Sequence, residues 1–275
     1  MKKLGSKERI TAHIFLSIFG FFSLFPIYIL LINSFKNNKE IFYNPLSFPE
    51  SIRWENYWDA FAFGGYSLAF KNSFIITILS IVSVLILSSL GAYALKNKRM
   101  PHNKFFQIYF LACTTIPVQL FIIPLYLWFG RLNLLNNYMG VALIYTALYT
   151  PFSMLLLLSY FESIPIDIEE SAYLDGASKW KIFWYIIVPM SKSALLTVAL
   201  LVTVWTWGEF ITAITFLSTG EMHTLVIKFY TLSGRFSDPW GQMFAFAVMM
   251  AIPIFITFLA LQKYFIKGLT AGAYK

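Results

Sequence analysis

The chain has 275 residues, of which 58% are hydrophobic and only 12% carry a charge. Ordinary soluble domains carry roughly 25% charged residues, so this composition argues against a soluble domain and predicts an integral membrane protein. The formal net charge is +8 at pH 7, and the placement of the basic residues decides whether a nucleic acid is a candidate partner.

Six apolar stretches are long enough to cross a bilayer, which takes about 20 residues. Because lipid offers no partner for backbone N–H and C=O groups, each span is expected to be helical. We therefore predict an all-α membrane protein with a single transmembrane domain over residues 1–275. The six spans are predicted near residues 14–32, 74–95, 105–129, 138–161, 194–217 and 243–261.

Lysine and arginine are unevenly distributed over the segments between these spans. If the N-terminus lies inside, the inner segments hold about twice as many of them as the outer segments. The positive-inside rule then places both termini, and the loop after the fourth span, in the cytoplasm. We expect a multi-pass protein of the cell membrane that contacts lipid. The excess of positive charge follows from the membrane topology, so no nucleic-acid partner is expected.

The third predicted span contains the single cysteine, Cys113, and two prolines, Pro117 and Pro124. One cysteine permits neither an intramolecular disulfide nor a cysteine metal cluster, and Cys113 is expected to be a small buried packing residue. Each proline removes a backbone donor and can bend the helix. Ordinary helix bending and the shaping of a translocation path both remain open for these prolines.

A charged loop, residues 162–190, follows the fourth span, and five of the 13 acidic residues lie in its first half. Pro165 suits the first turn of a helix, where a missing N–H costs nothing. Asp167 and Glu170 have the spacing of a capping box. These features predict a short helix outside the lipid.

The same pattern predicts where this helix ends. The helix is expected to run to about Leu174, and Gly176 supplies the conformational freedom for leaving it. Ser178 can cap a second helix that continues through Val188, with Pro189 near its end. Phe183, Ile186 and Ile187 have helical spacing and are expected to fasten this second helix to the bundle.

The loop resembles the EAA loop of ABC-transporter permeases, in which Glu-Ala-Ala is followed by three residues, Gly, nine residues and Ile-x-Leu-Pro. The residues in register are Glu170, Ala172, Gly176, Ile186 and Pro189, while Ser171 and Val188 depart from the pattern conservatively. The Asp175-Gly176-Ala177 core is the form seen in carbohydrate importers. The resemblance implies a type I ABC importer permease (MetI-like) fold.

In that family the loop is a coupling helix that docks on a cytoplasmic ATP-binding subunit. The residues expected to dock are Glu169, Glu170, Ala172, Tyr173, Leu174, Asp175, Gly176 and Ala177. Glu170 offers a carboxylate, the small residues permit close approach, and Tyr173 and Leu174 suit an apolar groove. The alternative is a solvated amphipathic connector in which Glu170 serves only as a cap.

Motifs for catalysis are absent from the sequence. There is no G-x-x-x-x-G-K-[ST] phosphate loop, no H-E-x-x-H zinc motif and no G-x-S-x-G nucleophile elbow. We expect no enzyme activity, no catalytic residue, no metal site and no cofactor bound by this chain. The resemblance implies that ATP and Mg bind in partner subunits.

A second stretch, Trp207-Gly208-Glu209-Phe210, resembles the Trp-Asn-Glu/Asp-Phe stretch of carbohydrate-importer permeases, with Gly208 in place of Asn. Glu209 is the one acidic residue inside a predicted span, which makes it a functional candidate. A hydrogen bond to a neighbouring helix is the alternative. Aromatic and polar groups suited to a sugar path are Gln119, Tyr126, Tyr145, Trp207 and Glu209.

The resemblance implies a permease subunit of an ATP-driven importer for a sugar or oligosaccharide. Its partners would be a second, non-identical permease, two ATP-binding subunits and an extracytoplasmic solute-binding protein. The alternative is a secondary transporter or channel acting without an ATPase. Such a protein would use intramembrane ion-binding residues and often shows internal repeats, which are not evident here.

Overall fold

The computed structural model describes residues 6–97, 100–232 and 239–273, with side chains described only between residues 8 and 264. These residues form two compact units. The first contains the described chain up to Ser67 together with Lys228–Ile252. The second contains Leu68–Ile227 together with the described chain from Pro253 onward.

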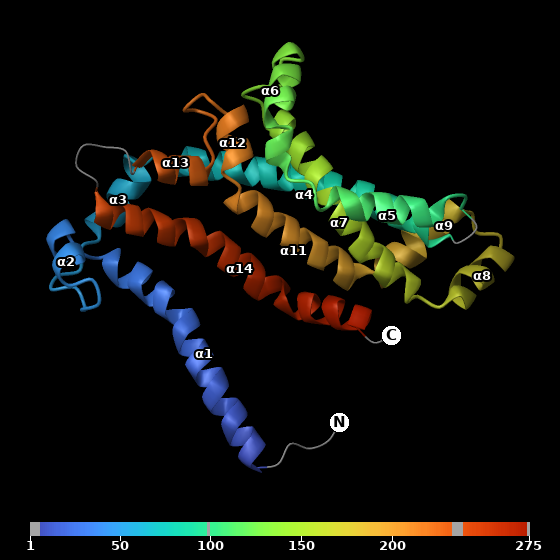
Figure 1. The fold of residues 1–275 in the computed structure, drawn as a ribbon, viewed down its shortest axis with the longest axis horizontal. Helices are drawn as coiled ribbons and strands as arrows, with labels where there is room; N and C mark the ends of the chain where they lie inside the picture. Colours follow the sequence, from blue (N-terminus) through green and yellow to red (C-terminus); the bar gives the residue numbers. More distant parts are fainter. Residues whose placement is uncertain (1–5, 98–99, 233–238, 274–275) are drawn as a thin grey trace. The chain divides into compact units, whose positions relative to one another are not determined.

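The described residues contain helices and turns and no strand, which confirms the predicted all-α class (Figure 1). The elements up to the fourth long helix are α1 (Ser6–Asn33), α2 (Asn38–Tyr43), α3 (Glu55–Ala62), α4 (Tyr66–Lys96), α5 (Asn103–Cys113), the 3-10 turn η1 (Val118–Leu120), α6 (Ile122–Arg131) and α7 (Tyr138–Glu162). The remaining elements are α8 (Ile166–Leu174), α9 (Lys179–Ile182), the π turn η2 (Phe183–Ile187), α10 (Val188–Met190), α11 (Lys192–Gly208), α12 (Ile211–Phe216), α13 (Leu225–Leu232) and α14 (Trp240–Ala273).

Four helices in the described chain are long and apolar enough to cross a membrane without a break. They are α1, α4, α7 and α14, which correspond to the first, second, fourth and sixth predicted spans. A fifth span is possible if α11 is joined to the helical segment before it, Lys179–Met190, which meets it at 75°. The third and fifth spans therefore differ from the prediction of six continuous helices.

The third predicted span, near residues 105–129, is not one helix. Helix α5 ends at Cys113, and Pro117 is extended, with φ −70° and ψ 133°. Proline disfavours the helical region for the residue before it and has no N–H to continue the ladder. The hydroxyls of Thr114 and Thr115 donate to the carbonyls of Leu111 (2.6 Å) and Ala112 (2.8 Å), so side chains satisfy acceptors at the end of the helix.

The fifth predicted span, near residues 194–217, is broken as well. Helix α11 ends at Gly208, and Glu209 is extended, with ψ 122°. A short helix, α12, follows from Ile211. Residues 194–217 are therefore apolar, as predicted, but do not form one continuous helix.

The core of the second unit joins α4, α7, η2 and α11. Helices α4, α7 and α11 run alongside one another in Figure 1. The fully buried side chains of the core include Val84, Leu157, Phe183 and Val198, one from each element. Small residues allow helix backbones to approach closely where no hydrophobic driving force exists between them. Ala92 and Ala194 are fully buried in this core and act in that way.

In the first unit, polar side chains hold the chain that follows α1. The amide of Asn56 donates to the carbonyls of Ser34 and Lys36, at 2.9 Å each. Tyr57 Oη and Ser34 Oγ form a 2.7 Å hydrogen bond. Burial lowers the pKa of Lys36, whose ammonium donates to the Asn44 carbonyl at 2.8 Å, and burial raises the pKa of Tyr57. These contacts satisfy backbone acceptors in a segment that has little regular structure.

Candidate functional site

The charged loop folds as a helix, a sharp turn and a second helix, as predicted. Helix α8 covers Ile166–Leu174, and Pro165 directly precedes it with φ −54° and ψ 132°. The predicted capping box is wrong, because α8 has no side-chain cap and Asp167 is already the second helical residue. Asp167 and Glu169 lie in the first turn, where negative charge favours the helix N-terminus.

Gly176 makes the turn after α8 and has φ +82°, in the left-handed region. The N–H of Gly176 donates to the carbonyl of Tyr173, and the N–H of Ala177 to that of Ala172, both at 3.0 Å. Such bonds close the C-terminus of a helix around a left-handed residue. Both the end of α8 and the role of Gly176 therefore match the prediction.

Ser178 caps the second helix, because its Oγ accepts the N–H of Lys181 at 3.3 Å. The helix continues through α9, η2 and α10 to Met190, one π turn interrupting it at Phe183–Ile187. Phe183 and Ile187 are fully buried in the core of the second unit. The predicted fastening of this helix to the bundle is confirmed for these two side chains, and Ile186 packs against the same core.

The two faces of α8 differ. Ile168 and Ala172 are partly buried against the core, as is Ala177 after the turn. Leu174 is 90% exposed and Tyr173 52% exposed, large fractions for side chains of this size. The remaining exposed members of the predicted docking set are Glu170, Asp175 and Gly176. A carboxylate beside two uncovered apolar side chains is a surface suited to a partner protein.

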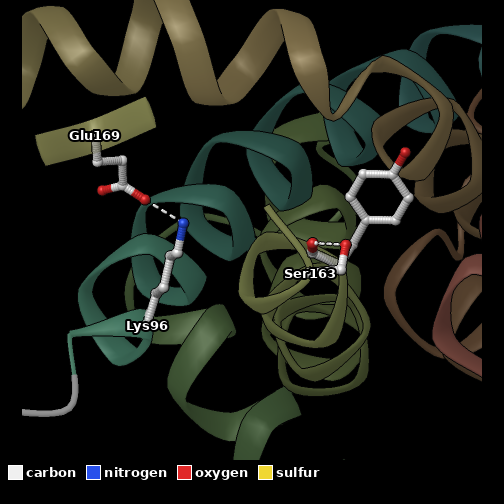
Figure 2. A network of polar contacts seen from close by, with 4 residues as sticks. Lys96, Ser163 and Glu169 are labelled. Carbon is white, nitrogen blue, oxygen red and sulfur yellow. Dashed lines mark hydrogen bonds and ion pairs between the residues drawn. The ribbon is translucent and has the colours of Figure 1, made fainter. Parts of the chain in front are cut away.

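The Glu169 side chain, also predicted to dock, is largely buried, unlike that of Glu170. The Glu169 carboxylate forms an ion pair with Lys96, the last residue of α4, and the two side chains are only 15% and 9% exposed (Figure 2). Sequence reasoning missed Lys96. The available signal was a basic residue ending an apolar span on the same predicted side of the membrane as the loop.

Of the five candidates for a translocation path, two are joined directly by a hydrogen bond. Tyr145 and Glu209 meet through a 2.8 Å hydrogen bond. Trp207 packs edge-on against Phe70, with ring centroids 5.7 Å apart. The other two, Gln119 in η1 and Tyr126 in α6, are exposed.

The Glu209 carboxylate lies at the break between α11 and α12. It accepts the N–H of Thr212 at 2.9 Å and that of Ala213 at 3.0 Å, in addition to the Tyr145 hydroxyl. Backbone donors in the first turn of a helix need such acceptors. Glu209 thus joins α12 to α7, which is the helix-packing alternative raised for it from the sequence.

No group of three or more His, Cys, Asp or Glu side chains able to hold a metal ion occurs among the described residues. Cys113 is a free thiol and is partly exposed, so the prediction that it is buried is wrong. The described side chains therefore offer interaction surfaces and helix contacts. Among these, the loop from α8 to α10 is the best-defined candidate site.

Long apolar helices joined by a helix–glycine–helix loop define a membrane permease of the ABC-importer type. The chain belongs to the family of binding-protein-dependent transport system inner membrane components, whose model matches residues 90–271. Family membership places it in a membrane and in an importer with further subunits, including a binding protein.

Individual relatives agree with this family. The chain is 34% identical over 262 residues to YurM of Bacillus subtilis, a probable ABC transporter permease protein, covering 95% of this chain and 87% of that protein. It is 32% identical over 253 residues to SmoH of Agrobacterium fabrum, a sulfoquinovosyl glycerol transport system permease protein, covering 92% and 89%. A crystal structure of a bacterial ABC transporter involved in the import of alginate contains a chain matched with a TM-score of 0.83 and 25% identity, covering 96% of this chain and all of that one.

Proposed function

We propose that this chain is the non-catalytic permease subunit of an ATP-driven importer for a sugar or oligosaccharide. SmoH belongs to a sulfoquinovosyl glycerol transport system, and the related crystal structure is of a transporter involved in the import of alginate. Both compounds contain sugar units. The proposed assembly contains a second, non-identical permease, two ATP-binding subunits that hold ATP and Mg, and an extracytoplasmic solute-binding protein. Both termini and α8 face the cytoplasm in this proposal, as the basic residues favour.

One observation carries the coupling role: the outer face of α8 is uncovered, while its other face is packed on the core. Glu170, Tyr173 and Leu174 are exposed, and Ile168 and Ala172 pack inward. The second helix of the loop is anchored by Phe183 and Ile187. A displacement imposed on the exposed face would therefore move buried helices instead of bending a loose connector. Coupling requires such a differential fit of one element to two states.

Two path candidates suit contact with solute better than the others. Gln119 and Tyr126 are exposed, and an amide and a phenol hydrogen bond to sugar hydroxyls. Tyr145 is only 1% exposed and its hydroxyl is already donated to Glu209. We propose that Gln119 and Tyr126 line the route in the present state, and that Tyr145, Trp207 and Glu209 shape it from behind.

The test is co-purification of the assembly in mild detergent, with sugar uptake measured in the same cells. Glu170→Ala is expected to release ATP-binding subunits and to abolish uptake. Ser171→Ala is the matched control, because Ser171 is exposed on the same helix and alanine is the residue of the family pattern. Uptake that persists without any ATP-binding subunit, or that survives Glu170→Ala unchanged, would show a transporter working alone.

A further inference from the structure

Two adjacent glutamates on α8 have different surroundings. Glu170 is exposed, whereas Glu169 points at the C-terminal end of α4 and pairs with Lys96 (Figure 2). The paired residues are 73 positions apart in the sequence. This contact therefore joins two helices that the chain does not connect directly.

The Glu169 carboxylate has a second neighbour on α4. The Tyr93 side chain, three residues before Lys96, lies close enough to interact with it electrostatically. The Tyr93 ring also packs on Phe183, with centroids 5.1 Å apart. Glu169, Lys96, Tyr93 and Phe183 thus connect α8, the end of α4 and the second helix of the loop in one place.

This geometry leaves Glu169 poorly placed to meet another subunit. A side chain that is 15% exposed and already paired would have to give up a largely buried cation before it could dock. Removing one partner of a desolvated ion pair strands the other charge, which is strongly unfavourable. Among the acidic residues predicted to dock, Glu170 and Asp175 are exposed and Glu169 is the exception.

We propose that Lys96 and Glu169 form a positioning strut that fixes α8 to the end of α4. The chain itself attaches α8 at two points, through residues 163–165 to α7 and through residues 175–178 to α9. Ile168 and Ala172 also pack on the core, but apolar contacts are non-directional and do not fix the orientation of the helix by themselves. The strut adds a directional attachment and transmits displacement of α8 to α4. This inference rests on the proposed coupling role of α8.

The test uses the complete transporter, with its ATP-binding subunits and binding protein, reconstituted in lipid vesicles. ATP hydrolysis and sugar uptake are measured on the same preparation. Lys96→Gln and Glu169→Gln are expected to retain the ATP-binding subunits but to lower uptake per ATP hydrolysed by about fivefold or more, the lower end of typical coupling between sites. The charge swap Lys96→Glu with Glu169→Lys is expected to restore most of that ratio.

A neutral pair, Lys96→Met with Glu169→Gln, keeps the test decisive if the single variants fold poorly, because replacing both charges strands neither. The strut predicts that the neutral pair assembles yet couples worse than the charge swap. The strut is overturned if the swap couples no better than the neutral pair. It is also overturned if Glu169→Gln loses ATP-binding subunits as Glu170→Ala does, which would make Glu169 a docking residue. A wild-type preparation without ATP-binding subunits would instead refute the proposed function.

Discussion

The turn between α8 and α9 depends on Gly176, and replacing it with alanine is a sharp test of the loop. Its φ of +82° lies in the left-handed region, which costs a residue with a Cβ about 1–2 kcal/mol. No heavy atom lies within 4 Å of a Cβ added there, so crowding adds nothing to this cost. The penalty is therefore conformational and confined to the turn.

A cost of about 1–2 kcal/mol changes a local equilibrium by a factor of about 5–30. The hydrogen bonds that close the turn, from Gly176 to Tyr173 and from Ala177 to Ala172, are the contacts that weaken. Gly176→Ala is expected to raise the rate of amide hydrogen exchange at the end of α8 by that factor. The buried helices are expected to exchange at the wild-type rate, and uptake per ATP is expected to fall.

Two control variants isolate the cause. Gly176→Asn is expected to behave more like the wild type, because asparagine tolerates the left-handed region better than alanine does. Gly208→Ala likewise adds a Cβ with no heavy atom within 4 Å, but Gly208 has no positive φ, so exchange in α8 is expected to remain unchanged. If Gly176→Ala exchanges like the wild type, the turn is not held by this backbone conformation and the reasoning fails.

Two further predictions concern the helix contacts around α7. Glu209→Gln is expected to destabilise the purified complex by about 1–3 kcal/mol, because an amide NH₂ replaces one carboxylate oxygen among donors; a changed KM with an unchanged melting temperature would instead indicate contact with solute. Gly140→Ala is expected to cost about 1–3 kcal/mol through overlap of the new Cβ with the Leu134 carbonyl oxygen, while Gly130→Ala makes only a 3.5 Å contact with Leu135. Equal melting temperatures for these two variants in fluorescence-monitored unfolding would contradict the close approach at Gly140.

Much of the loop could be predicted from sequence because its signals are local. Pro165, Gly176 and Ser178 each act through their own backbone or through a hydrogen bond within three residues. The capping-box prediction failed for an equally local reason. The helix begins one residue before Asp167, and the D-x-x-E spacing does not reveal that offset.

The breaks in the third and fifth spans could not be predicted from apolar length. Hydropathy measures whether a segment suits lipid and does not measure whether its helix is continuous. Pro117 indicated a bend in the third span but not a complete exit from the helix. In the fifth span, Glu209 marks the break because its carboxylate meets Tyr145 from α7 and the first backbone amides of α12.

The sequence by itself determined the membrane class, the all-α fold and the position of the charged loop, because composition, apolar length and spacing are properties of the chain alone. Only the tertiary structure decided which of two adjacent glutamates faces outward. Successive residues on a helix point about 100° apart, and the packing of Ile168 and Ala172 on the core sets which direction is inward. That packing turns Glu169 toward Lys96 and leaves Glu170 exposed to a partner.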